Sequence, residues 1–218
     1  MSLFDKLFGP STTDESYYAL VSDEIASGKI RPGLWAIALA DCEYDETKAK
    51  AIYLKMRVKT LKEELKQSEN SAFAELSQAN KQGDAKRARE LALPLANIGN
   101  AYGIYCHGCF SLGDAKSSQD AEQAIGLLNS VAKKYPDAHF RIGRVFCFGT
   151  NYCQANGDIA FQQFVAGAKA GNVGCQYELG LMYVRGKDWR TARKWLEAAK
   201  LQGHQDAAYE LSKFKWYQ

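Results

Sequence analysis

Residues 171–180 read Gly-Asn-Val-Gly-Cys-Gln-Tyr-Glu-Leu-Gly, and residues 203–212 read Gly-His-Gln-Asp-Ala-Ala-Tyr-Glu-Leu-Ser. Both stretches begin with glycine and share Tyr-Glu-Leu, and the two tyrosines, Tyr177 and Tyr209, lie 32 residues apart. Self-similarity at a period of this length is typical of repeat proteins, in which small helical units stack on one another. The spacing therefore predicts an array of helices.

A second motif extends this array toward the N-terminus. Ile142-Gly-x-x-Phe-x-x-Gly149 matches Leu179-Gly-x-x-Tyr-x-x-Gly186, and Ile98-Gly-x-x-Tyr102 is a weaker copy without the last glycine. In each motif we expect the first glycine to let a neighbouring helix approach closely, and the aromatic residue to fill the space one turn further on. Because one helix pair cannot bury its own apolar face, the pairs must stack.

A second helix is expected after each of these motifs. The predicted ranges are 119–134, 158–170 and 188–201, and residues 103–118 are expected to form a long connection before the first of them. Asp158 and Asp188 begin two of these helices and are most simply N-caps, because their carboxylates accept hydrogen bonds from free backbone N–H groups.

These residues resemble the Sel-one-like repeat, a relative of the tetratricopeptide repeat. The family pattern is roughly Ala-x-x-x-Leu-Gly-x-x-Tyr-x-x-Gly, a loop with Asp, then Lys-Ala-x-x-Trp, Ala-Ala and a closing Gly. The match is close over residues 175–203, good over 139–171 apart from a longer loop at 150–156, and weak over 84–136. The resemblance implies an all-α fold, a right-handed α-solenoid of about three helix-pair repeats, and a scaffold or adaptor role, often in bacteria.

The chain is expected to have three parts: a helical module at 1–67, a linker or leading helix at 68–83, and the repeat domain at 84–218. Helices are predicted in the module at 16–27, 34–40 and 47–65 from apolar spacing and turn residues. The basic residues of the third helix, Arg57 among them, are expected to face solvent. This part of the chain resembles a short helical module of bacterial proteins whose function is uncertain. The resemblance rests on Gly33-Leu-Trp, residues 45–51 and residues 53–57.

Composition and charge indicate where the protein acts and what kind of partner it binds. The 218 residues are 46% hydrophobic and 24% charged, with a formal net charge of +3. No apolar run approaches the roughly 20 residues that span a bilayer, and no signal peptide is recognisable. We therefore expect a cytoplasmic protein with reduced thiols. The basic excess, at the C-terminus, is too sparse for nucleic-acid binding and favours an acidic protein or peptide as partner.

Cys106-His-Gly-Cys109 is the one motif that suggests chemistry. With Cys147 and Cys153 it would supply four thiolates for zinc, and alone it would form a redox pair. These cysteines are weak metal candidates, because the second pair has unusual spacing and a small buried residue is expected at Cys106. Ordinary thiols are favoured, and we expect no metal and no cofactor.

Catalytic motifs are missing from the sequence. There is no Gly-rich phosphate loop, no His-Glu-x-x-His and no Gly-x-Ser-x-Gly. The three histidines are scattered along the chain, and none lies beside a plausible nucleophile and carboxylate. The sequence therefore indicates a protein that is not an enzyme.

The concave face is the expected binding surface, because the resemblance implies that first helices line it. Each position is counted from the Leu or Ile that precedes the repeat glycine. Selected residues that lie two positions before this Leu or Ile, or two, five or six positions after it, are expected to face a bound peptide. They are Asn100, Arg144, Tyr177, Val184, Arg185, Tyr209, Lys213 and Trp216. This mixture of basic and aromatic side chains suits a peptide with acidic and apolar residues. The alternatives are a structural subunit that forms homo-oligomers through its N-terminal helices, and a cysteine-based zinc or redox sensor.

Overall fold

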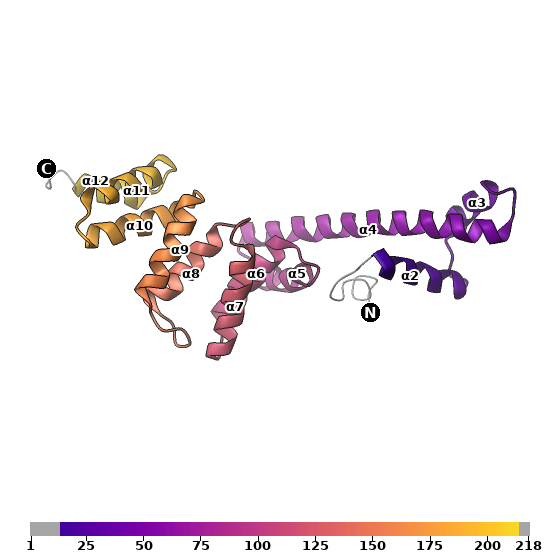
Figure 1. Ribbon diagram of the computed structural model, residues 1–218, viewed down its shortest axis with the longest axis horizontal. Coiled ribbons are helices and arrows are strands. Elements are labelled where there is room, and N and C mark those ends of the chain that lie inside the picture. Colours follow the sequence, from indigo (N-terminus) through magenta and orange to yellow (C-terminus); the bar gives the residue numbers. More distant parts are fainter. Residues whose placement is uncertain (1–13, 214–218) are drawn as a thin grey trace. The chain divides into compact units, whose positions relative to one another are not determined.

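The computed structural model describes residues 14–213 and gives them as eleven helices, α2 to α12 (Figure 1). The only β pairing among them is one isolated bridge between Thr150 and Cys153. The all-α prediction is confirmed. The chain divides into two compact units, Met1–Asn100 and Ala101–Gln218.

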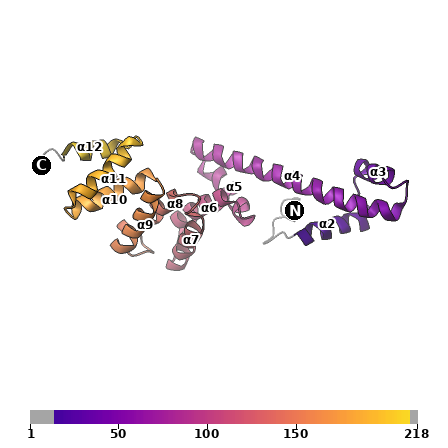
Figure 2. The same cartoon turned by 45° about the horizontal axis from the view of Figure 1, so that its top comes forward.

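The first unit contains four described helices: α2 (Asp14–Ala26), α3 (Pro32–Ala40), α4 (Glu46–Gln82) and α5 (Ala85–Asn97). Both α2 and α3 pack on the first half of α4, and α5 returns along its second half (Figures 1 and 2). α2 and α3 lie where the sequence predicts helices. Asp45 caps α4 by accepting hydrogen bonds from the backbone N–H groups of Thr47 and Lys48.

α4 is much longer than the sequence suggests. It has 37 residues, roughly 55 Å at the usual rise, and runs unbroken through position 67, where the sequence places the end of a module. No glycine or proline interrupts it before Gly83, which closes it in the left-handed conformation at φ 73°. Residues 68–82, expected to be a linker or leading helix, are its second half. No helix among residues 14–213 combines the length and the apolarity needed to cross a membrane.

A buried ion pair lies in the first unit, and it overturns one expectation. Arg57, predicted on the solvated face of the helix, is only 4% exposed because α2 covers it. Its Nε lies 3.2 Å from an oxygen of Glu24, and its Nη1 lies 3.4 Å from an oxygen of Glu64. The Tyr53 hydroxyl donates to Glu24 and accepts the Arg31 N–H at 2.9 Å. Burial and the bond to Glu24 both raise the pKa of Tyr53.

The second unit is a series of paired helices: α6 (Ala101–Asp114), α7 (Ser118–Val131), α8 (Asp137–Phe148), α9 (Gly157–Lys169), α10 (Val173–Arg185), α11 (Trp189–Leu201) and α12 (Gln205–Lys213). Each first helix packs on the second helix that follows it, successive pairs are in contact, and α12 packs on α11 (Figures 1 and 2). The predicted helix-pair repeats are confirmed, with second helices within a few residues of their expected bounds.

Two repeat glycines act as the sequence predicts, and one does not. A Cβ on Gly143 would lie 2.5 Å from the Phe164 ring, and a Cβ on Gly180 would lie 2.7 Å from Leu196. Gly99 instead follows α5 with φ 79° and has open space around its Cβ position. The expected contact in the first pair is made by Gly108, where a Cβ would lie 3.1 Å from Leu128.

The long connection predicted at 103–118 is therefore wrong, because most of it is helix α6. The Ile-Gly match placed the weakest repeat too early in the chain. Its true glycine follows a histidine, His107, where the pattern has an aliphatic residue.

Candidate functional site

The predicted surface residues fall into three groups. Asn100 belongs to the first unit, where its side-chain amide donates to Glu69 at 2.8 Å. Trp216 lies outside the described residues. The other six are on the first helices of the second unit: Arg144 on α8, Tyr177, Val184 and Arg185 on α10, and Tyr209 and Lys213 on α12.

A stripe on α8 combines a cation with two aromatic rings. Phe140, Arg144 and Phe148 are spaced four residues apart, so they share one face of the helix. The Arg144 guanidinium lies 5.8 Å from the centre of the Phe140 ring and 5.4 Å from that of Phe148. Cations within about 6 Å of a ring centre are attracted by its electrons. Phe148 is 65% exposed, so the outer end of this stripe is open to a partner.

The stripe adjoins α10. A Cβ on Gly174 would lie 2.8 Å from the Phe140 ring, so this ring lies directly against the α10 backbone. Phe140 and Phe148 were missed as surface residues, although positions two before and six after Ile142 are theirs. The counting rule itself was therefore sufficient to find them.

A second aromatic group joins α10 to α12. The rings of Tyr177 and His204 stack with centres 4.2 Å apart. The Lys213 ammonium lies 4.2 Å from the centre of the Tyr209 ring and 2.8 Å from a carboxylate oxygen of Glu210. Tyr209 is 64% exposed. Burial, followed by nearby carboxylates, raises the pKa of Tyr177.

Val184 and Tyr177 have a partly structural role. Both pack against the buried cluster that contains Leu196 and Ala199. Their outer atoms alone are therefore available to a partner. The exposed members of the predicted set are Arg144, Arg185, Tyr209 and Lys213.

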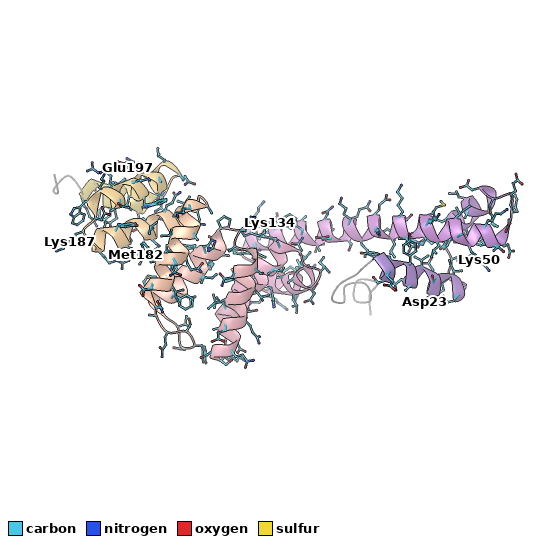
Figure 3. All side chains as sticks on the ribbon, viewed as in Figure 1. Asp23, Lys50, Lys134, Met182, Lys187 and Glu197 are labelled. Carbon is cyan, nitrogen blue, oxygen red and sulfur yellow. The ribbon has the colours of Figure 1, made fainter. Side chains whose placement is uncertain are left out.

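Charge is distributed unevenly along these helices. Arg144 and Arg185 make no ion pair with any carboxylate of residues 14–213, and Lys187 lies in the turn just after α10 (Figure 3). At the opposite end, Asp137 begins α8, accepts from the Tyr105 hydroxyl, and lies 3.1 Å from Arg141 Nε. The arginines without an ion-pair partner therefore lie in the C-terminal halves of α8 and α10.

Comparison with solved structures gives partial likenesses, and one of them is described here. The chain is similar to the crystal structure of a Sel1 repeat protein from Oxalobacter formigenes, with 24% identity and a TM-score of 0.48. The similarity covers 60% of this chain and 39% of that chain, so this protein spans well under half the length of the other. No family model and no curated protein matches the chain. The helix pairs described above remain the basis for describing the fold as a repeat array.

The cysteine candidates are not brought together. Within residues 14–213, no group of three His, Cys, Asp or Glu side chains is placed to hold a metal ion. Cys106 is buried in α6, and burial raises the pKa of Cys109. Burial also raises the pKa of Cys153. Burial therefore leaves Cys109 and Cys153 less readily ionised than a free cysteine, and the thiolate is the reactive form of the side chain.

Proposed function

We propose that this protein is a non-catalytic adaptor, and that the face formed by α8, α10 and α12 binds a peptide with acidic and apolar side chains. The observation that supports this most strongly is Arg144, which is held between Phe140 and the exposed Phe148. Ring contacts on both sides restrict the guanidinium before any partner arrives, so less side-chain entropy is lost on binding. Arginine and aromatic residues are also the side chains that most often dominate protein interfaces.

The preference for acidic residues follows from the free cations. Arg144 and Arg185 have no carboxylate partner within the described chain, so a partner's Asp or Glu would meet charges that are not already neutralised. Lys213 already pairs with Glu210 and would contribute less. The exposed rings of Phe148 and Tyr209 would cover the partner's apolar side chains. We place this action in the reducing cytoplasm, where thiols such as those of the six cysteines stay reduced.

Selection from a random peptide library tests this function. Peptides enriched on the wild-type protein should combine Asp or Glu with aromatic or aliphatic residues. Arg144→Glu/Arg185→Glu/Lys213→Glu should weaken the Kd of such a peptide about 100-fold, taking about 1 kcal/mol for each lost pair. The fluorescence anisotropy of a labelled peptide measures this.

A charge-matched control separates local contacts from net charge. Lys133→Glu/Lys169→Glu/Lys200→Glu makes the same change in charge at exposed positions at or just beyond the ends of α7, α9 and α11. This variant should bind within about threefold of wild type, since distant exposed charges are screened by salt. Equal weakening by the two triple variants would refute the proposed face.

A further inference from the structure

The turn between α3 and α4 exposes an aromatic ring among carboxylates. Residues 41–46 read Asp-Cys-Glu-Tyr-Asp-Glu. Tyr44 is 75% exposed, more than any other large hydrophobic residue described in the first unit. Tyrosine is among the residues that most often dominate the binding energy of protein interfaces.

The backbone of this turn is strained. Glu43 has φ 52° and Tyr44 has φ 66°, so two consecutive residues other than glycine adopt the left-handed conformation. Such a conformation costs roughly 1–3 kcal/mol per residue and persists only where the surroundings hold it. An observed strain of this kind is a reason to look for a function.

Local contacts hold the turn in place. The backbone N–H of Tyr44 donates to the carbonyl of Leu39 at 2.8 Å. The Cys42 sulfur faces inward and lies 3.0 Å from the carbonyl oxygen of Ala38 and 3.1 Å from that of Asp45. The ring is therefore presented on an ordered backbone, which lowers the entropy lost when it binds.

The carboxylates of the turn are mostly unpaired. Asp45 caps α4 and lies 3.2 Å from Lys48. Asp41, Glu43 and Glu46 make no ion pair within residues 14–213. The turn thus offers an aromatic ring and free negative charge, the chemistry that the face of α8, α10 and α12 is proposed to bind.

We infer that residues 41–46 of one copy of this chain dock on the face of α8, α10 and α12 of a second copy. This inference rests on the proposed function and names its partner. Tyr44 contacts the exposed rings of Phe148 and Tyr209, while the turn's carboxylates pair with Arg144 and Arg185. Each copy carries one turn and one face, so the contact is heterologous and more than two copies can join.

Sedimentation velocity over a range of protein concentrations tests the docking, with one variant for each side of the contact. Glu43→Gly/Tyr44→Gly removes the ring and one charge, and glycine accepts the left-handed conformation, so the turn keeps its path. Arg144→Glu/Arg185→Glu/Lys213→Glu removes the opposite side. Wild type should associate as concentration rises, and each variant alone should need at least tenfold higher concentration.

Mixing the two variants gives the decisive result. The turn variant retains an intact face and the face variant retains an intact turn, so the mixture should form a complex of two chains and grow no further. Failure of the mixture to form this complex, or association of either variant like wild type, would overturn the inference. Circular dichroism of each variant verifies that its helices are intact.

Peptide binding separates this inference from the proposed function. The glycine variant should bind the selected acidic peptide at least as tightly as wild type does. A wild-type protein that stays monomeric yet binds the peptide overturns the docking and leaves the proposed function standing. A monomeric wild type whose peptide affinity rises in the glycine variant also overturns it, because the turn then covers the face of its own chain.

Discussion

Arg57→Ala is expected to lower the free energy of unfolding of the first unit by about 3–5 kcal/mol, the range for breaking a buried ion pair. Arg57 is 4% exposed and lies between Glu24 and Glu64. Without it, the carboxylate of Glu24 stays largely buried with no cation beside it. Hydrogen exchange of the α4 backbone amides in increasing urea measures this loss within the first unit.

Two further variants identify the cause of that loss. Glu24→Gln/Arg57→Met removes both charges and should cost less than Arg57→Ala, because no uncompensated charge remains. Lys55→Ala removes an exposed cation from the same helix and should change stability by less than about 0.5 kcal/mol. A loss below 1 kcal/mol for Arg57→Ala would show that the buried pair is not formed.

Phe164→Ala is expected to destabilise the second unit by about 3–5 kcal/mol, as other buried aromatic truncations do. Phe164 is fully buried on α9 and fills the space opposite Gly143 on α8. Removing the ring leaves a cavity between the two helices of one repeat. Hydrogen exchange of α8 and α9 amides should show the loss, while α4 amides stay unchanged.

The effect of Gly143→Ala on stability should depend on the residue at position 164. The change should destabilise the wild-type protein and stabilise the Phe164→Ala variant. In wild type the new Cβ would lie 2.5 Å from the ring of Phe164, so overpacking of about 1–3 kcal/mol outweighs the gain in helix propensity. In the Phe164→Ala background the clash is gone, and the same change should stabilise by up to about 1 kcal/mol.

Gly126→Ala is the matched control for Gly143→Ala. Gly126 lies within α7 with no atom within 4 Å of the Cβ position, so alanine there should stabilise by about 0.5–1 kcal/mol. Equal destabilisation by Gly143→Ala in both backgrounds would mean that the ring and the glycine do not face each other.

The repeats were predictable from sequence because their packing depends on a glycine opposite a large residue. Gly143 and Gly180 appear within a recognisable motif, so their helices were found. The first pair was misplaced, since Gly108 follows a histidine and Gly99 happens to follow isoleucine. The contact with Leu128 and the helical backbone of Gly108 distinguish it from Gly99, which has φ 79° and open space around its Cβ position.

The first unit was harder to predict because charge patterns do not say which face a neighbour covers. Arg57 lies in a run of basic residues, and only the partners on α2 and α4 show that it is buried. Residues 68–82 are polar and resemble a linker in composition, yet they contain no helix breaker. For the candidate site, the counting rule reaches Phe148, six positions after Ile142, and the structure adds that this ring is 65% exposed.

The most direct test of the proposed binding face is hydrogen exchange with and without a selected acidic peptide. We expect slower exchange of amides in α8, α10 and α12, with little change in α7, α9 and α11. Protection confined to those second helices, or to residues 14–100, would contradict the claim that the first helices of the second unit hold the partner.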